Sequence, residues 1–312
     1  MARATRGLAA ALAALALIAS ACQNRPEAPS RGISTIPHPE GSFPVTVEAA
    51  NGPVQIAERP ERIVSLSPTA TEMLFAIEAG AQVVAVDDQS NFPPEAPMTE
   101  LSGFEPNVEA VASYDPDLVV ISDDIADLIA SLEALEIPVL AEPAAATLED
   151  TYDQIEDLGA ATGNPAEADQ LVSSMRSEIE EIVTQVPEYD QVPTYYYELD
   201  PTYFTATSGT FIGELYGLLG LENIADRADE KGTGYPQLSA EYIVEADPEL
   251  IFLADARCCD QSAETVAERP GWQRVTAVQE GNVIELDDDV ASRWGPRIVD
   301  LLRVVSEALP SA

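Results

Sequence analysis

The sequence predicts an α/β protein with two similar βα lobes, each built on a parallel-rich sheet. Short apolar runs alternate along the chain with stretches of helical periodicity, an alternation typical of parallel sheets covered by helices. One piece is repeated, because NVEAVASYDPDLVVISD at residues 107–123 matches SAEYIVEADPELIFLAD at residues 239–255, at a constant offset of 132 residues. Each copy reads as a short helix, an Asp-Pro turn and a buried strand. The two copies predict paired lobes with a ligand cleft between them.

Length and charge limit the partners of this protein. The 312 residues are 46% hydrophobic and 22% charged, which is enough for two lobes with cores of their own. Acidic residues number 55 against 15 basic ones, for a net charge of −40. Such a surface repels phosphates, so nucleic acid is excluded as a partner. The same surface predicts adaptation to high salt, with a merely acidic exported protein as the alternative.

The N-terminus has the features of an export signal. Residues 1–21 read as a signal peptide, whose apolar run at residues 8–18 is too short to span a bilayer. The small residues Ala19-Ser20-Ala21 precede Cys22, although leucine is commoner at the first of these positions. We expect a diacylglyceryl group on Cys22 and a location at the outer face of the cell membrane. Ordinary secretion with a free N-terminal cysteine is the alternative.

Residues 22–42 are rich in Pro, Ser, Gly and Glu and predict a flexible tether. This segment contains His38, the only histidine of the chain. We expect His38 to be exposed to solvent and not to bind a metal.

The N-terminal lobe is predicted to span residues 43–163. It opens with a hairpin around Asn51-Gly52, a dipeptide typical of two-residue turns. A buried strand follows at residues 63–66, and Ser67-Pro68 caps a helix that Gly80 is expected to end. A capping box of Thr69 with Glu72 is the competing start of that helix. Further strands are expected at 83–86, 118–121 and 139–140, and helices at 108–114 (capped by Asn107), 125–135 and 148–160.

The C-terminal lobe is predicted to span residues 188–312. A long amphipathic helix at residues 164–187 comes before it and ends at Pro187. In the lobe itself, strands are expected at 194–199, 250–254 and 283–286, and helices at 210–219, from 240 to the Asp247-Pro248 turn after the cap Ser239, and at 296–309.

Three motifs resemble one protein family. Arg62-Ile-Val-Ser-Leu-Ser-Pro, Thr71-Glu72 and Asn91-Phe-Pro-Pro are similar to the start of the substrate-binding proteins of bacterial ABC importers for cobalamin, ferric siderophores and haem. The resemblance continues to the C-terminus. It implies that the helix at 164–187 joins the two lobes. It also implies a monomeric binding protein without enzyme activity, which serves a permease dimer and its cytoplasmic ATPase subunits.

The resemblance implies ligand contacts from loops at strand ends, although core packing is an equally simple role for each aromatic. The residues concerned are Gln89, Phe92, Phe104, Tyr203, Tyr235, Asp289, Arg293 and Trp294. This set is mainly aromatic and amide-like, so it favours a large, nearly neutral corrinoid over anionic haem or a ferric siderophore. Two observations oppose that preference: Arg257, Arg293 and Arg297 can meet an anion, and the N-terminal hairpin is common among siderophore binders. No cofactor is expected beyond this ligand.

Glu109 and Glu241 are related by the repeat and fall in the first turn of their helices. In the resembled family, one glutamate of each lobe at this motif position docks onto arginines of the permease. The alternative is that both are ordinary acids at helix starts.

No enzyme or metal motif is present in the sequence. It has no Gly-rich phosphate loop, no nucleophile elbow and no cluster of His and Cys that could hold zinc. A secreted carboxylate-dependent hydrolase is the distant alternative, since some of the many acids must lie close together. Cys258 and Cys259 have no other intramolecular partner once Cys22 carries lipid. We predict a disulfide between them in the cleft wall, with two free thiols as the alternative.

Overall fold

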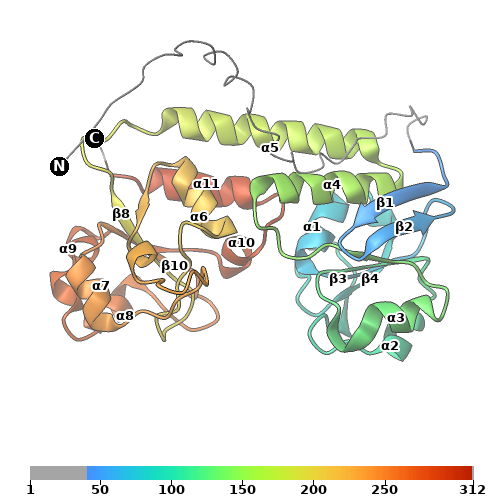
Figure 1. Ribbon diagram of the computed structural model, residues 1–312, viewed down its shortest axis with the longest axis horizontal. Helices are drawn as coiled ribbons and strands as arrows, with labels where there is room; N and C mark the ends of the chain where they lie inside the picture. Colours follow the sequence, from blue (N-terminus) through green and yellow to red (C-terminus); the bar gives the residue numbers. More distant parts are fainter. Residues whose placement is uncertain (1–40, 311–312) are drawn as a thin grey trace, which may run out of the picture. The chain divides into compact units, whose positions relative to one another are not determined.

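Two parallel sheets form the framework of the computed structural model, which describes residues 41–310 (Figure 1). The first sheet has the order β5-β4-β3-β6-β7 and the second has the order β11-β10-β8-β9. Every neighbouring pair in both sheets is parallel. The strands are β3 (Ile63–Leu66), β4 (Val83–Asp87), β5 (Met98–Leu101), β6 (Leu118–Ile121) and β7 (Val139–Ala141), then β8 (Thr194–Glu198), β9 (Glu222–Asn223), β10 (Leu250–Leu253) and β11 (Val283–Glu285).

The two sheets share a strand order apart from the extra edge strand β5. In each, the first strand (β3 or β8) has the next one (β4 or β9) on one side, and two later strands (β6 and β7, or β10 and β11) on the other. In the first sheet, β5 lies beyond β4. The predicted α/β class with parallel-rich sheets is therefore confirmed. The hairpin is confirmed as well: β1 (Val45–Ala49) and β2 (Gly52–Ile56) pair antiparallel around the Asn51-Gly52 turn.

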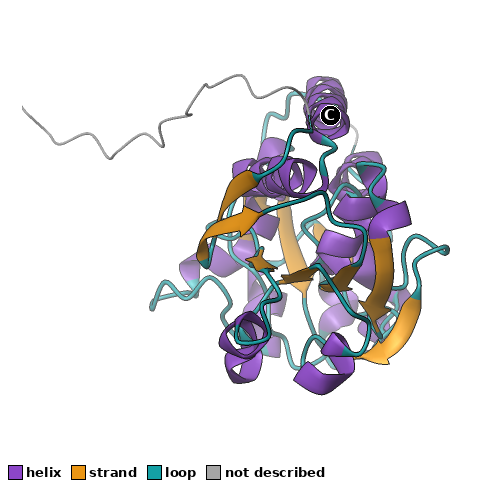
Figure 2. Ribbon diagram, turned by 90° about the vertical axis from the view of Figure 1, so that its right-hand side faces the viewer, coloured by secondary structure: helices purple, strands orange, loops and turns teal. Residues whose placement is uncertain are grey.

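Helices cover both faces of the strands (Figure 2). Their bounds are α1 (Pro68–Ala76), α2 (Val108–Ala112), α3 (Leu128–Glu133), α4 (Leu148–Thr162), α5 (Pro165–Gln185), α6 (Phe211–Leu218), α7 (Ala240–Ala246), α8 (Ala263–Glu268), α9 (Thr276–Glu280), α10 (Asp288–Ser292) and α11 (Ile298–Glu307). Short 3-10 helices lie at Gly80–Gln82, Ile125–Asp127, Ile224–Arg227 and Trp272–Arg274.

Alternate residues of each strand point into different cores. Leu118 and Val120 of β6 join a large cluster that includes residues of α1, α4, α5 and α11, whereas Val119 and Ile121 face a smaller cluster with α3. In the second sheet, Leu250 and Phe252 join the same large cluster. One core therefore connects both sheets. Figure 1 shows α5 lying along α4 on one part of its length and along α11 on another.

Three predicted helices have different bounds in the structure. Ser67 does cap α1, since its hydroxyl accepts a hydrogen bond from the Ala70 N–H. The helix ends at Ala76, however, and Gly80 opens a 3-10 helix instead of ending α1. The backbone turns earlier, at Glu78, where φ is +62°.

The helix expected at residues 125–135 is broken by left-handed residues at Ala126 and Asp127, so only α3 is regular. The closing helix begins at Ile298, two residues later than expected.

The repeat is visible as matching local structure. The side chains of Asn107 and Ser239 cap α2 and α7 in the same way, each accepting the N–H three residues on. Asp115 and Asp247 both have a left-handed backbone, with φ of 47° and 49°.

The equivalence extends to the acid that precedes each repeated strand. The carboxylate of Asp117 accepts the backbone N–H groups of Glu61 and Arg62, which lead into β3. Glu249 accepts the N–H of Thr194 at the start of β8. Each repeat thus fastens its strand to the neighbouring central strand by a side-chain carboxylate.

Candidate functional site

The candidate site lies where the strands of both sheets end. Loops that follow the carboxyl ends of parallel strands meet at one edge of a sheet, which is where open α/β sheets bind ligands. We call the loops after β3, β4, β5 and β8, together with α10 and the segment that joins it to α11, the strand-end site. Most of the ligand-contact residues expected from the sequence lie in these segments.

A hydrogen-bonded network joins the loop after β4 to α10. The Arg293 guanidinium donates to the Gln89 carbonyl oxygen at 2.9 Å and to Asn91 Oδ1 at 3.1 Å. It also pairs with the Asp289 carboxylate at 2.7 Å, and the Asn91 side chain donates to Asp289 at 2.8 Å. The structure therefore brings Gln89, Asp289 and Arg293 together, although Gln89 takes part through its backbone.

The buried carboxylate of Glu72, on α1, holds this network from the protein interior. Its side chain is only 2% exposed, and its carboxylate pairs with Arg293 at 2.8 Å and with Arg297 at 2.5 Å. Arg297 also lies over the ring of Phe92, with 4.3 Å between the guanidinium carbon and the ring centroid. The proposed capping box with Thr69 is wrong, because Ser67 is the cap and Glu72 faces the two arginines.

A small cavity lies beside the network. It has a volume of about 120 Å³, and its lining includes Tyr235, Arg293 and Trp294 together with Phe211 of α6. The Trp294 indole N–H donates to Gln154 of α4 at 2.9 Å, which fixes the ring plane. Tyr235 remains 48% exposed, so it can also meet a ligand.

Phe104 stands out from the loop after β5. It is 73% exposed, the largest exposed fraction among the large apolar side chains of the described residues. The preceding Gly103 lies close to the chain beneath it, since a Cβ built there would be 2.5 Å from the Leu66 carbonyl oxygen. Because Gly103 packs this closely on Leu66, it holds the following Phe104 at the rim of the strand-end site.

The loop after β8 places Tyr203, an expected ligand contact, against the second-sheet core. Tyr203 has φ of +71°, and its ring stacks on Trp272 at 5.9 Å in the second-sheet core. None of the contacts among the described residues joins Tyr203 to the network around Arg293. Its neighbour Phe204 is 39% exposed instead. Two adjacent aromatics give no signal in the sequence for which of them packs on the core.

A chain of hydroxyl groups supports the site from beneath. Thr71 donates to Ser65 at 2.9 Å and contacts Ser90 at 2.9 Å, and Ser90 donates to Asp87 at 2.5 Å. All four side chains are buried. Burial raises the pKa of Asp87, while the hydrogen bond from Ser90 acts in the opposite direction. This chain holds the ends of β3 and β4 together under the Gln89–Phe92 loop.

Two other buried acids have strongly raised pKa values. Burial raises the pKa of Glu142, which follows β7, to about 8, with the charges of Asp153 and Asp157 adding to the shift. Burial and the nearby Glu198 carboxylate raise the pKa of Asp255 to about 7. Glu142 is 4% exposed and Asp255 is fully buried, so neither carboxyl group can meet a substrate from solution in this structure.

Cys258 and Cys259 lie with their sulfur atoms 2.7 Å apart, without a disulfide bond recorded between them. The disulfide expected from the sequence stays a prediction. The loop itself is tied to α10, because Asp288 accepts the backbone N–H of Cys258 at 2.7 Å. The loop that carries the two cysteines therefore contacts α10, the helix of the strand-end site that also carries Asp289.

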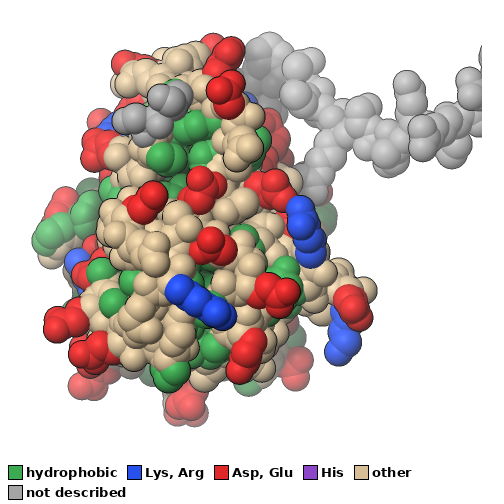
Figure 3. Space-filling model, turned by 90° about the vertical axis from the view of Figure 1, so that its left-hand side faces the viewer, with side chains coloured by type: hydrophobic (Ala, Val, Ile, Leu, Met, Phe, Trp, Pro, Cys, Tyr) green, Lys and Arg blue, Asp and Glu red, His purple; other side chains and the backbone are tan. Residues whose placement is uncertain are grey.

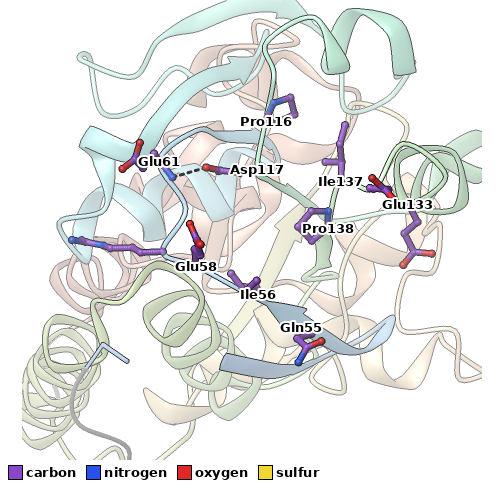
Figure 4. Close-up of a pocket in the computed structure, with 12 residues that line it drawn as sticks. Gln55, Ile56, Glu58, Glu61, Pro116, Asp117, Glu133, Ile137 and Pro138 are labelled. Carbon is purple, nitrogen blue, oxygen red and sulfur yellow. Dashed lines mark hydrogen bonds between the residues drawn. The ribbon is translucent and has the colours of Figure 1, made fainter. Parts of the chain in front are cut away.

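A larger pocket than the cavity beside the network lies elsewhere. It has a volume of about 730 Å³ and is lined by residues around the beginnings of β3, β6 and β7, among them Glu61, Asp117 and Pro138 (Figure 4). This is the edge opposite the strand-end site. Figure 4 shows Asp117 bonded to the Glu61 backbone, so its carboxylate is already occupied by the structural contact of the repeat.

Other expected features are placed as follows. Glu109 and Glu241 are both exposed in the first turn of α2 and α7. Within residues 41–310, no group of three or more His, Cys, Asp or Glu side chains is arranged to hold a metal ion. No helix of the described chain is long and apolar enough to cross a membrane. Cys22, His38 and the signal peptide lie outside the described residues.

Comparisons with known proteins agree in fold and family. A family model described as periplasmic binding protein matches residues 63–290. The ABC transporter substrate-binding lipoprotein YvrC of Bacillus subtilis is 34% identical over 277 residues, with 86% of each chain covered. The cobalamin-binding protein of Halobacterium salinarum is also 34% identical over 277 residues, covering 86% of this chain and 74% of that protein. The vitamin B12 binding protein BtuF of Vibrio cholerae is 27% identical, with a TM-score of 0.66 and coverage of 80% of this chain and 96% of that chain.

Proposed function

The chain belongs to the periplasmic binding protein family, and we propose that it captures a large metal chelate outside the cytoplasm and delivers it to the permease of an ABC importer. The ligand we favour is a corrinoid. Two relatives that cover most of this chain carry cobalamin or vitamin B12 in their names. The partners in this role are a permease dimer with its ATPase subunits.

Neutralised charge at the strand-end site is the observation that supports a corrinoid. Each of the three arginines near the site already has a carboxylate partner: Arg257 pairs with Asp287 at 2.7 Å, Arg293 with Glu72 and Asp289, and Arg297 with Glu72. An anionic chelate would have to compete with these carboxylates for the guanidinium groups. A nearly neutral chelate does not, and it can stack on the exposed rings of Phe92, Phe104 and Tyr235.

Ferric siderophores and haem are the alternative ligands in the same transport role. Their charges favour clefts with unpaired arginines, and Arg257 is the least enclosed of the three, with 66% of its side chain exposed. A preference for these chelates would mean that the Arg257–Asp287 pair opens on binding.

The remaining parts of the proposal concern anchoring and chemistry. We infer a lipid anchor at Cys22 and a monomer that binds its chelate without converting it. The lipoprotein relative from Bacillus subtilis supports the anchor, and the family supports binding without turnover. Glu109 and Glu241, exposed at equivalent places of the repeat, are proposed as the permease contacts.

Titration with four chelates tests the ligand. Mature protein is mixed with cyanocobalamin, cobinamide, haem and a ferric siderophore, and binding is followed by calorimetry. We expect one corrinoid per chain with submicromolar affinity and unchanged ligand after recovery. Tight binding of haem or the siderophore, with no binding of either corrinoid, would replace the corrinoid and keep the transport role.

A pair of variants locates the binding surface. Phe104→Ala should weaken corrinoid binding about tenfold, because it removes an exposed ring on which the ligand can stack. A tenfold change in affinity corresponds to about 1.4 kcal/mol. The matched control is Leu135→Ala, another exposed apolar residue (53% exposed) that follows α3 near the opposite edge of the sheet. Equal affinities of the two variants would exclude Phe104 from the ligand surface.

A further inference from the structure

Glu72 is a buried acid shared by two arginines that come more than 200 residues later in the chain. Its side chain is 2% exposed, and it accepts Arg293 at 2.8 Å and the Arg297 Nε at 2.9 Å. Glu72 belongs to α1, which follows the first strand of the first sheet, whereas the two arginines lie between α10 and α11. A charge buried to this degree is tolerated only when it is paired, so this contact fixes α1 against the C-terminal helices.

Arg293 has little capacity left for a ligand. Its side chain is 7% exposed, and its two terminal nitrogens already donate to Glu72, Asn91, Asp289 and the Gln89 carbonyl. These acceptors come from α1, from the loop after β4 and from α10. The guanidinium therefore sets the position of the loop at residues 89–92, which carries Phe92 at 39% exposure.

Arg297 completes the arrangement from the other side of Glu72. Its guanidinium lies over the Phe92 ring at 4.3 Å while its Nε and a terminal nitrogen bind the Glu72 carboxylate. Cation–π contact of this kind orients a ring at the edge of a cluster. The exposed aromatic surface of the loop thus depends on the buried acid beneath it.

We propose that Glu72, Arg293 and Arg297 are positioning residues, which hold the 89–92 loop in its ligand-binding conformation without touching the ligand. A loop that is already ordered loses less entropy when the ligand binds, so the preorganised state binds more tightly. Loss of the anchor frees the loop and speeds ligand release. The proposal rests on the proposed function for its ligand, whereas the loop's order can be measured in the ligand-free protein.

Glu72→Gln tests the anchor. The amide keeps the size of the side chain and one carbonyl acceptor, but it removes the charge that two arginines share. We expect faster amide hydrogen exchange over residues 88–92 in ligand-free protein. We also expect cyanocobalamin release to be about tenfold faster or more, because changes of this kind act mainly on the dissociation rate.

The matched control is Glu198→Gln. Glu198 is also fully buried and pairs with one arginine, Arg269, but this pair lies wholly on the second-sheet side. It should lower the melting temperature as Glu72→Gln does, while exchange at residues 88–92 and cyanocobalamin release stay at wild-type values. This comparison separates a positioning role from general loss of stability.

Asn91→Ala is a second variant that keeps the buried charges paired. It removes the contacts of an exposed amide with Arg293 and Asp289, so folding is not at risk. It should raise exchange at residues 88–92 in the same direction and by less. Unchanged exchange in both variants, or cyanocobalamin release no faster than in Glu198→Gln, would overturn the proposal. Should the wild-type protein bind none of the four chelates, the proposed function fails, and the exchange measurement alone decides the positioning role.

Discussion

Gly103 is a single residue on which the rim of the site depends. A Cβ at this position would lie 2.5 Å from the Leu66 carbonyl oxygen and 3.1 Å from Asp87 Oδ2. Gly103→Ala should therefore destabilise the protein by about 1–3 kcal/mol, the usual cost of overpacking. Chemical denaturation measures the change.

Gly217→Ala is the control for this substitution. Gly217 lies in α6, and a Cβ there meets nothing within 4 Å in the described part of the chain. Since alanine favours a helix by up to about 1 kcal/mol over glycine, this variant should be neutral or more stable. A loss of stability equal to that of Gly103→Ala would show that the close approach to Leu66 is not the cause.

Glu142 predicts a pH dependence of stability. Its pKa rises from 4.5 to about 8 on folding because the carboxyl group is buried. The folded state thus keeps a proton that the unfolded chain releases, and each unit of pKa difference corresponds to about 1.4 kcal/mol. This contribution to the free energy of unfolding is complete below pH 4.5 and is lost as the pH rises towards 8.

Glu142→Gln should remove this loss of stability at high pH. The neutral amide should leave stability near pH 5 little changed and increase it at pH 8 relative to wild type. Melting temperatures at the two pH values measure the effect, with the exposed Glu105→Gln as control. A variant that is equally destabilised at both pH values would contradict the protonated state of Glu142.

Sequence patterns do not reveal which polar residues become buried partners. Glu72 fits a capping box in the sequence, yet in the folded chain it faces arginines 221 and 225 residues away. Tyr203 and Phe204 are adjacent aromatics, yet Tyr203 stacks on Trp272 while Phe204 is 39% exposed. Glu72 and Asn91 both belong to motifs singled out in the sequence, but the contact of Asn91 with Asp289 likewise depends on tertiary structure.

At the scale of elements, regular periodicity made the prediction successful. The repeated helix, turn and strand were expected in both halves, and α2–β6 and α7–β10 have these structures. Five short elements escaped prediction, since they show no period of their own: β5, β9, α8, α9 and α10. The equally short α2 was found through its cap and the repeat. The prediction of the site is incomplete for this reason, because the missed helix α10 carries Asp289 and ends next to Arg293.

The repeated helices carry a prediction about the permease. Replacing Glu109 and Glu241 together by alanine should abolish uptake and complex formation with the permease, while corrinoid affinity stays at the wild-type value. The reason is that both carboxylates are exposed at equivalent helix starts, one on each repeat. Uptake assays and pull-down with the permease measure the loss.

The control for bulk charge is a second double variant. Glu167 and Glu264 also lie in the first turn of helices, α5 and α8, but outside the repeat. They are preferable to Glu178, which pairs with Arg303 at 3.2 Å. Because electrostatic attraction between a net charge of −40 and a basic surface is not specific, equal loss from both double variants would mean that bulk charge guides docking.

For the whole molecule, charge repulsion is the dominant electrostatic feature. Figure 3 shows acidic side chains spread over one face with few basic ones between them. Exposed ion pairs such as Arg176–Glu149 contribute little, about 0.2–1 kcal/mol each, and salt weakens them further. A net charge of −40 adds self-repulsion over the whole molecule, and salt weakens this repulsion too.

Stability should therefore increase with salt. We expect the melting temperature to rise between low salt and molar NaCl, and calorimetry in the two buffers measures it. Comparison with a neutral osmolyte at equal osmolality separates screening from solvent exclusion. An unchanged or lower melting temperature in NaCl would show that attractive pairs outweigh the repulsion.

The pairing of Glu72 with Arg293 and Arg297 also sets an order of events during synthesis. The chain is made from its N-terminus at about 5–20 residues per second, so the first sheet is complete long before the last helices exist. The buried carboxylate must wait for partners 221 and 225 residues downstream. A nascent or truncated chain that stops before Arg297 leaves this acid incompletely paired. Only a chain made almost to its last helix has both sides of the site joined.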